Sequence, residues 1–215
     1  MENKICALFD MDGVVIDTEP QYDIIWRAIG KKYLPEIEGF EKIIKGTTMP
    51  DILSNHFSHL SEDELQNLVC MHDEFERKMT YPEIPNVVSF IQSLKKAGIS
   101  TGLVTSSGED KVTAVSEKFH FDTLFDTIVT ARHISEGKPN PMCYLLAAQN
   151  LGINPSNCFV FEDSFAGIKA GTAAGMKVIG LSTTNSKESL QDKALMVIPD
   201  FSNFSISQLT AHISL

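Results

Sequence analysis

Short apolar segments alternate with helix-length segments over most of this chain, and the alternation predicts a parallel β-sheet covered by helices. Apolar runs of buried-strand length occur at Ile5–Phe9, Gly98–Val104, Thr127–Ala131 and Cys158–Phe161. Helical patterns follow the last three, at 109–119, 142–151 and 165–174. The expected fold is therefore α/β, with a doubly wound, Rossmann-like and mostly parallel sheet as its core.

A different pattern occupies the segment from about Ile16 to Tyr81, where helical spacing replaces the strand-like runs. Aromatic and aliphatic side chains recur there at helical intervals, as from Tyr22 to Ile29. Ser61 to Glu64 has the sequence of a capping box that opens a further helix. We expect an inserted α-helical cap domain, residues 16–82. It interrupts a core domain made of residues 1–15 and 83–215, and the linkers lie near 14–18 and 81–85.

Two carboxylates stand at the end of the first predicted strand, where apolar sequence should resume. Aspartate is disfavoured in strands and costly to bury unpaired, so Asp10 and Asp12 need a partner such as a metal cation. In extended chain, residues i and i+2 leave the same face. One carboxylate could attack phosphorus while the other transfers protons. The alternative is a strand-ending turn with solvated acids.

Three further polar groups follow the other predicted strands. Thr105 and Ser106 begin a hydroxyl-rich turn before a helix, where phosphate oxygens can bind, although such residues also cap helices. Lys138 is held by the proline after it and could neutralise an attacking carboxylate and phosphoryl oxygens. Glu162 and Asp163 offer oxygen ligands, although an acid at a helix start is also a common cap.

The carboxyl ends of parallel strands meet at one edge of a doubly wound sheet, which is where ligands bind. All four polar groups are expected at that edge. Asp10, Glu162 and Asp163, with the backbone carbonyl of Asp12, would supply ligands for Mg²⁺. The set contains the parts needed for magnesium-assisted phosphoryl transfer.

These residues also carry a family resemblance. The sequence resembles phosphotransferases of the haloacid dehalogenase superfamily, in the branch of the β-phosphoglucomutases and related sugar-phosphate phosphatases. The matching motifs occur in family order and cover essentially the whole chain: 10–20 (DMDGVVIDTEP), 105–107 (TSS), 138–141 (KPNP) and 162–168 (EDSFAGI). The resemblance also implies the inserted cap, which would close over the active site and select the substrate.

The resemblance implies a role for each matching residue. Asp10 would be the nucleophile and a magnesium ligand, and Asp12 would be the general acid/base and a carbonyl ligand. Thr105, Ser106 and Lys138 would hold phosphate. Glu162 and Asp163 would complete the metal site. Dehalogenases of the superfamily are expected to lack an acid at the position of Asp12, so its presence favours phosphorus chemistry.

Cap residues bear on the choice between phosphatase and mutase. Related enzymes carry a Lys-Gly pair facing the active site at the place of Lys45 and Gly46, although a helix end with a lysine explains the same residues. β-Phosphoglucomutases have an arginine at the position of Met49 and a histidine at that of Tyr22. A thioether cannot replace the bidentate hold of guanidinium on phosphate, so a bisphosphate should bind poorly.

Composition narrows the range of partners. The net charge is −10 and the pI is about 5.0, so nucleic acid and anionic membranes are not expected as partners. A small phosphorylated substrate is expected instead. The amino terminus shows neither a signal peptide nor a membrane span, and the four scattered cysteines read as reduced core thiols. We expect a cytoplasmic protein that is a monomer or a weak dimer.

The leading hypothesis is a magnesium-dependent phosphatase that acts on a small phosphorylated metabolite through an aspartyl-phosphate intermediate. The first alternative is a β-phosphoglucomutase. A second alternative, outside the enzymes, is a catalytically silent sensor that binds phosphorylated ligands in the same acidic pocket. The substrate cannot be named from the sequence, because the catalytic residues are shared across many reactions.

Overall fold

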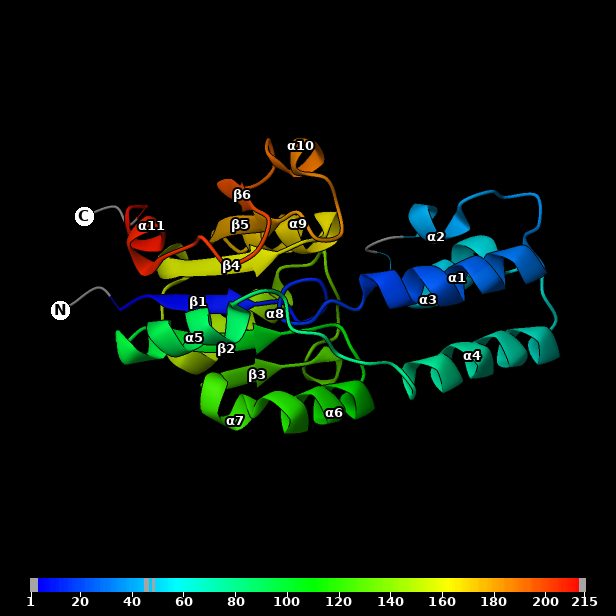
Figure 1. Cartoon of the computed structure of the whole chain (residues 1–215), viewed down its shortest axis with the longest axis horizontal. Helices are drawn as coiled ribbons and strands as arrows, with labels where there is room; N and C mark the ends of the chain where they lie inside the picture. Colours follow the sequence, from blue (N-terminus) through cyan, green and yellow to red (C-terminus); the bar gives the residue numbers. More distant parts are fainter. Residues whose placement is uncertain (1–3, 45–46, 48, 213–215) are drawn as a thin grey trace. The chain divides into compact units, whose positions relative to one another are not determined.

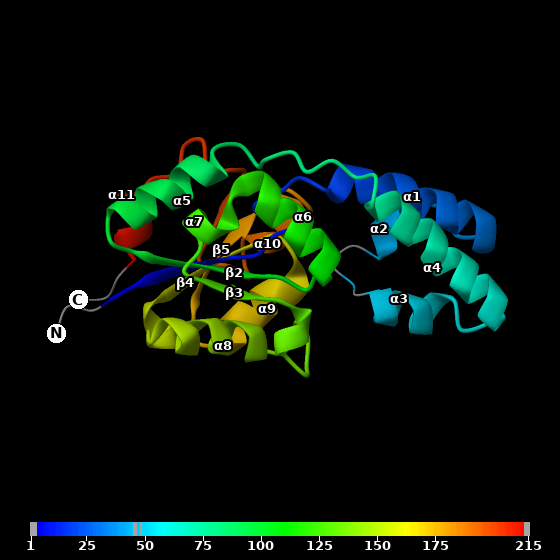
Figure 2. The same cartoon turned by 90° about the horizontal axis from the view of Figure 1, so that it is seen from below.

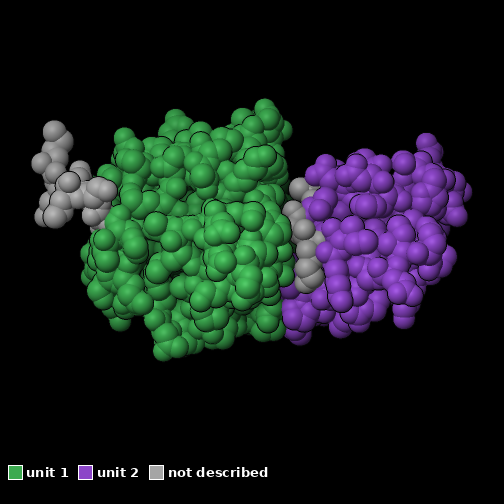
Figure 3. Space-filling view, turned by 90° about the horizontal axis from the view of Figure 1, so that it is seen from above, with its two compact units in different colours: residues 1–17, 82–215 green, residues 18–81 purple. Residues whose placement is uncertain are grey.

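The chain forms two compact units in the computed structural model, which describes residues 4–44, 47 and 49–212 (Figure 3). The core unit consists of residues 1–17 and 82–215, and the helical unit of residues 18–81. The division into a core domain and an inserted cap domain of residues 16–82 stays a prediction. Among the described residues, no helix has the length and apolar character needed to cross a membrane.

One six-stranded sheet organises the core unit, and all its neighbouring strands are parallel (Figure 1). The strand order is β3-β2-β1-β4-β5-β6. The strands are β1 (Cys6–Phe9), β2 (Ser100–Val104), β3 (Thr127–Val129), β4 (Cys158–Glu162), β5 (Lys177–Leu181) and β6 (Met196–Ile198). The predicted doubly wound α/β fold with a parallel sheet is confirmed.

Helices cover both faces of this sheet (Figure 2). The first face carries α5 (Val87–Lys96), α6 (Glu109–Phe119), α7 (Phe121–Leu124) and α11 (Ile206–Thr210). The second face carries α8 (Met142–Leu151) and α9 (Phe165–Ala173). The remaining short helices are α10 (Lys187–Leu190), beside β6, and the 3₁₀ turns η1 (Ala131–His133) and η2 (Pro155–Asn157).

The central strands are buried on both faces because successive side chains point in opposite directions. On the first face, the rings of Phe9 and Phe161 stack with their centroids 4.6 Å apart, and Phe90 of α5 packs against both. On the second face, Leu8 and Val160 pack in a cluster with residues of α8 and α9. This double burial fixes the sheet and leaves polar groups only where the strands end.

The strand order places a change of direction between β1 and β4. The chain runs outward from β1 through β2 to β3, returns to β4 beside β1, and continues outward to β5 and β6. Ligands of open α/β sheets bind at the carboxyl ends of the strands at such a switch point. Asp10 directly follows β1, and Glu162 is the last residue of β4.

The helical unit contains α1 (Glu19–Tyr33), α2 (Phe40–Ile43), α3 (Met49–His56) and α4 (Glu62–Glu76). Its core is a cluster of buried apolar side chains that includes Trp26, Phe40, Phe57 and Leu68. Ser61 caps α4: its Oγ accepts from the N–H of Glu64, whose carboxylate accepts from the N–H of Ser61. The predicted capping box is therefore confirmed.

Some sequence predictions differ from the structure in detail. The strand predicted to reach Ala131 ends at Val129 and turns into η1, whereas β4 extends one residue further than predicted, to Glu162. Cys70 is exposed, so the description of all four thiols as core residues is wrong for this one. Cys70 lies on a polar face of α4, and the apolar residues next to it in the sequence gave no indication of its exposure.

Candidate active site

Asp10 is fixed at the sheet edge by the strand before it. The four residues of β1 are fully buried. The N–H of Asp10 donates to the carbonyl oxygen of Phe161 at 3.1 Å, which continues the pairing of β1 and β4 by one residue. The side chain of Asp10 is itself nearly buried. The backbone therefore holds this carboxylate at the switch point of the sheet.

Lys138 joins the ends of the two central strands. Its Nζ donates to Oδ1 of Asp10 and to Oε1 of Glu162, both at 2.6 Å, and to the carbonyl oxygen of Val104 at 3.3 Å. The side chain of Lys138 is only 7% exposed. A buried ammonium is tolerated when it is paired and hydrogen-bonded in this way. The sequence predicted Asp10, Lys138 and Glu162 at one edge of the sheet, and the structure places Lys138 in contact with both acids.

Glu162 is a fully buried carboxylate whose two oxygens accept hydrogen bonds from several donors. Oε1 accepts from Lys138 and from the hydroxyl of Tyr144 at 2.8 Å. Oε2 accepts from the N–H groups of Asp163 and Ser164 and from the Ser164 hydroxyl. Tyr144 was missed from the sequence, because a tyrosine in the apolar pattern of α8 gives no sign of a polar partner.

Asp163 is oriented by the loop that follows β5. Its Oδ2 accepts from the hydroxyl of Thr184, and its carbonyl oxygen accepts from Nδ2 of Asn185 at 2.9 Å. The hydroxyl of Thr183 in the same loop donates to the carbonyl oxygen of Gly13 at 2.6 Å. This loop was also missed. Its signal is the run of hydroxyl and amide residues that ends the apolar segment 177–181.

Two glycines make room for the acidic groups. A Cβ at Gly13 would lie 2.0 Å from Oδ2 of Asp163, and Gly13 also has φ of +73°. A Cβ at Gly167 would lie 1.7 Å from Oε1 of Glu162. Real Cβ atoms never approach oxygen this closely, so any other residue at these positions would displace a carboxylate. The two glycines belong to the site as much as the acids do.

The donor set fits a hard divalent cation. Asp10, Glu162 and Asp163 each offer a carboxylate oxygen, and these three atoms lie within 4.8 Å of one another. Mg²⁺ prefers a few carboxylate oxygens and completes its octahedron with water and phosphate. The missing side chains of Gly13 and Gly167 are what allow the Asp163 and Glu162 carboxylates to occupy these positions. The residues present therefore fit the predicted magnesium site.

Burial and neighbouring charges shift the protonation of this cluster. Burial raises the pKa of Asp10 to about 7; the Glu162 carboxylate adds to this rise and Lys138 opposes it. Burial acts to lower the pKa of Lys138, but the Asp10 and Glu162 carboxylates outweigh it and hold that pKa well above its ordinary value. Lys138 therefore remains an ammonium, and the cluster keeps an excess of acid that a cation would balance.

The hydroxyl loop follows β2 as predicted. Thr105 is buried, its N–H donates to the carbonyl oxygen of Val129 at 2.9 Å, and its Oγ1 accepts from the N–H of Ser107 at 3.0 Å. Ser106 is exposed. The alternative that these hydroxyls cap the next helix is wrong, because the N-cap of α6 is Gly108 and it makes no side-chain cap bond.

Asp12 lies beyond β1 and has its own partners. Nζ of Lys111 donates to its Oδ1 at 2.5 Å, and the Ser107 hydroxyl donates to its Oδ2 at 2.6 Å. Lys111 is the third residue of α6 and is nearly buried. Lys111 was missed from the sequence. Its only signal is a lysine in the first turn of a helix that follows a hydroxyl loop.

The predicted residues of the cap cannot be placed at a site. Lys45 and Gly46 lie outside the described residues. Met49 is the first residue of α3, and Tyr22 lies on α1, where its hydroxyl donates to Oε1 of Glu76. This hydrogen bond joins two residues of the helical unit.

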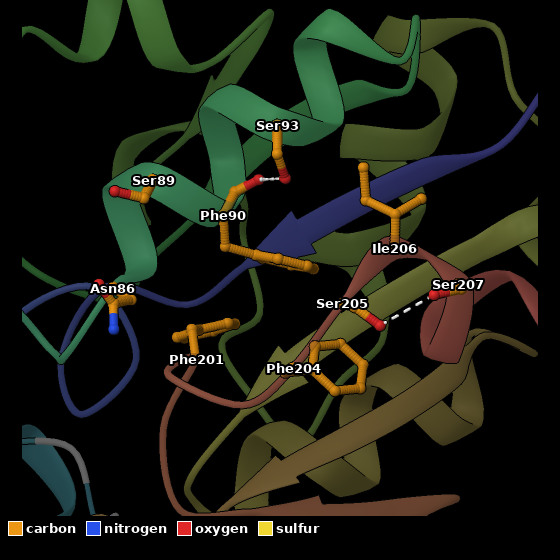
Figure 4. A pocket seen from close by; sticks show the side chains of 9 residues that line it. All are labelled: Asn86, Ser89, Phe90, Ser93, Phe201, Phe204, Ser205, Ile206 and Ser207. Atoms are coloured by element: carbon orange, nitrogen blue, oxygen red, sulfur yellow. Dashed lines mark hydrogen bonds between the residues drawn. The ribbon is translucent and has the colours of Figure 1, made fainter.

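A separate hollow of about 450 Å³ lies between α5 and the C-terminal segment of the core unit (Figure 4). Its apolar lining includes Phe90, Phe201 and Phe204, and its polar lining consists of serines and one asparagine. Ser93 donates to the carbonyl oxygen of Phe90 at 2.6 Å, which occupies that hydroxyl. Without a charged group, this hollow does not match the chemistry of the acidic cluster.

The fold and the site define an α/β protein with a lysine-bridged acidic cluster at the switch point of a parallel sheet. The sequence model for "Haloacid dehalogenase-like hydrolase" matches residues 7–181. The match covers most of the chain, and the protein belongs to this hydrolase family. The resemblance predicted from the motifs is confirmed.

Individual relatives have phosphatase names. The chain is 31% identical over 179 residues to "Phosphorylated carbohydrates phosphatase" of Thermotoga maritima, covering 80% of this chain and 82% of the relative. It is 30% identical over 192 residues to "Hexitol phosphatase A" of Escherichia coli, with 88% of each covered. These relatives support the predicted phosphohydrolase class.

A solved structure shows that the chain is also similar to a β-phosphoglucomutase. The structure of a β-phosphoglucomutase from Clostridium difficile has a TM-score of 0.79 and 26% sequence identity, covering 97% of this chain and 96% of that one. The shared fold therefore spans enzymes named as phosphatases and as a mutase, and residues rather than fold must separate the two activities.

Proposed function

We propose that this protein is a magnesium-dependent phosphatase that hydrolyses a small phosphorylated metabolite, such as a sugar phosphate, through an aspartyl-phosphate intermediate. The observation that carries the proposal is the Asp10 carboxylate, bonded to Lys138 at the switch point and set within reach of Glu162 and Asp163. The phosphatase names of the relatives support the same class of substrate.

Asp10 is the proposed nucleophile. Its carboxylate attacks phosphorus, a new bond forms between Asp10 and phosphorus, and the bond from phosphorus to the substrate oxygen breaks. The electron pair stays on the leaving oxygen, which takes a proton from Asp12. Lys138 lies 2.6 Å from Asp10 and offsets negative charge during this transfer.

Hydrolysis of the intermediate reverses the role of Asp12. Its carboxylate takes a proton from water as the water oxygen attacks phosphorus, and the bond from phosphorus to Asp10 breaks. Inorganic phosphate leaves, and both aspartates return to their starting state. Thr105 and Ser106, on the loop after β2, are the proposed donors to the phosphate oxygens.

Magnesium would be held by Asp10, Glu162, Asp163 and the carbonyl oxygen of Asp12. When bound, it would neutralise charge on the phosphoryl oxygens. The buried, hydrogen-bonded positions of Glu162 and Asp163 support this assignment, because neighbouring groups already orient each carboxylate before any ligand arrives.

The proposal is tested by phosphate release from a panel of sugar phosphates, polyol phosphates and nucleotides. Wild-type protein with Mg²⁺ should release phosphate from at least one class. Asp10→Asn should reduce kcat by at least about 10⁴-fold, because the nucleophile is lost. Removal of metal by a chelator should abolish turnover, and added Mg²⁺ should restore it. The matched control is Asp122→Asn, an exposed aspartate on α7, which should turn over at the wild-type rate.

Two outcomes would favour the alternatives. Conversion of β-glucose 1-phosphate to glucose 6-phosphate would make the protein a mutase. The structural likeness to a β-phosphoglucomutase is the reason to test for this activity. Stabilisation by phosphorylated ligands without turnover of any ester would indicate a sensor. Persistent phosphate release in Asp10→Asn would refute the aspartyl-phosphate mechanism itself.

A further inference from the structure

Lys111 occupies a position that local stability does not favour. It is the third residue of α6, where the positive end of the helix dipole repels a cation. Its side chain is also only 5% exposed, and an ammonium buried to this degree loses most of its hydration. Two unfavourable terms at one residue point to a role beyond holding the fold together.

The partner of Lys111 is the carboxylate of Asp12. Nζ of Lys111 donates to Oδ1 at 2.5 Å, and Oγ of Ser107 donates to Oδ2 at 2.6 Å. With a donor on each oxygen, the rotation of the carboxylate plane about the Cβ–Cγ bond is fixed. Ser107 is fixed in turn, since its N–H donates to Oγ1 of Thr105.

The two donors differ in what they permit. A lysine ammonium can only donate, so the oxygen that it contacts accepts in every state of Asp12. A serine hydroxyl can donate or accept, so it can remain bonded whether or not Oδ2 carries a proton. This asymmetry distinguishes Oδ1 as the anchored oxygen and Oδ2 as the oxygen that can exchange a proton.

We propose that Lys111 is a positioning residue that, together with Ser107, orients the Asp12 carboxylate for proton transfer to the leaving oxygen. The inference rests on the proposed function. Lys111 acts through Asp12 and need not touch the substrate. As the bond from phosphorus to the leaving oxygen breaks, its electron pair stays on that oxygen, which takes the proton from Oδ2 of Asp12.

The test compares two leaving groups. p-Nitrophenolate departs without protonation, whereas the alkoxide of an alkyl or sugar phosphate needs a proton from an acid. The ratio kcat/KM reports the steps up to departure of the leaving group. Lys111→Met should lower kcat/KM by about 10²-fold for the alkyl ester, as expected when a proton donor is misplaced, and by less than about threefold for the aryl ester.

Matched variants sharpen the result. Lys118→Met removes an exposed lysine from the same helix and should leave both ratios unchanged. Ser107→Ala should show the same leaving-group bias as Lys111→Met, and it serves as the second variant if Lys111→Met fails to fold. In an Asp12→Asn background, Lys111→Met should have no further effect, because the group that it orients no longer transfers a proton.

Failure of this inference is distinct from failure of the proposed function. Equal losses for both leaving groups would overturn the inference and leave the phosphatase standing. An additive effect of Lys111→Met in Asp12→Asn would overturn it as well. A wild-type protein that hydrolyses no phosphate ester would overturn the phosphatase, and with it the role assigned to Lys111.

Discussion

The core unit and the helical unit are stabilised by different kinds of buried group. Within the described residues, the core unit buries the side chains of three acids and two lysines, Asp10, Glu162, Asp163, Lys111 and Lys138, whereas the buried ionisable residues of the helical unit are Glu41 and His72. The rest of the helical core is apolar and rich in aromatic rings. The lysine-paired acidic cluster therefore lies in the core unit, where buried charges need each other as partners.

This contrast separates two kinds of variant. Changes at the sheet edge of the core unit should reduce activity and unpair buried charges. Changes in the helical core should reduce stability by ordinary loss of packing, with a size set by the volume removed. Trp26 provides a local fluorescence probe of unfolding in the helical unit, because it is the single tryptophan of the chain and lies in that unit.

The largest effect is expected for Lys138→Met. Without the ammonium, the carboxylates of Asp10 and Glu162 are left buried without their cation, and breaking a buried pair in this way costs about 3–5 kcal/mol of unfolding free energy. Phosphate release should be lost as well. Urea unfolding in chelator, followed by far-UV circular dichroism, measures the stability change.

Controls decide whether charge is the cause. Lys187→Met, at an exposed lysine of α10, should change stability by less than about 0.5 kcal/mol. Adding Glu162→Gln to Lys138→Met should recover part of the lost stability, since it removes one of the unpaired charges. A loss below about 1 kcal/mol in the single variant would show that the lysine does not compensate these acids.

The sheet edge that holds the acidic cluster could be predicted from the sequence. Several of the side-chain contacts at that edge could not. Asp10, Lys138 and Glu162 could be placed together because each follows an apolar strand, and parallel strands end at one edge. Tyr144, Lys111 and Thr184 could not, because their partners are distant in sequence and their own neighbours look like ordinary helix or loop. Contacts between distant segments depend on packing geometry that no local pattern records.

Strand assignment shows the same limit. β1 and β4 were predicted because continuous apolar runs mark strands that are buried on both faces. β5 and β6 were not assigned. Both lie in apolar runs, at 177–181 and 194–198, but runs this short do not by themselves distinguish a strand from a segment of buried helix. The helical unit was identifiable as a whole, because its apolar spacing is that of helices over many residues.

The next largest effect is expected for Phe57→Ala in the helical unit. Phe57 is fully buried, with its ring centroid 5.5 Å from that of Phe40 and 6.3 Å from that of Tyr33. Truncation removes this packing and leaves a cavity, which typically costs about 3–5 kcal/mol. The midpoint of the Trp26 fluorescence transition in urea should fall accordingly.

An exposed apolar residue of the same unit provides the control. Ile43 of α2 is 55% exposed, so Ile43→Ala should shift the transition by less than about 1 kcal/mol. If Phe57→Ala has an effect as small as Ile43→Ala, the apolar cluster does not determine the stability of the helical unit, and the contrast between the units fails on that side.

The smallest effect offers the closest comparison, because both units contain the same helix-capping motif. Ser61 begins α4 in the helical unit and Ser205 begins α11 in the core unit, each in a capping box completed by Glu64 or Gln208. Replacing either serine by alanine should cost about 1 kcal/mol of local stability, since one N–H donor loses its acceptor. The Trp26 transition should shift with Ser61→Ala and stay unchanged with Ser205→Ala.

The value of this pair is that chemistry and size of the change are held constant while its location varies. A shift of the Trp26 transition by Ser61→Ala alone means that the helical unit responds to its own cap and unfolds as a separate cooperative unit. An equal shift by Ser205→Ala would mean that one transition includes both units. In that case the charges of the sheet edge and the aromatic packing of the helices would contribute to a single free energy of unfolding, and variants at either place would lower the stability of the whole chain.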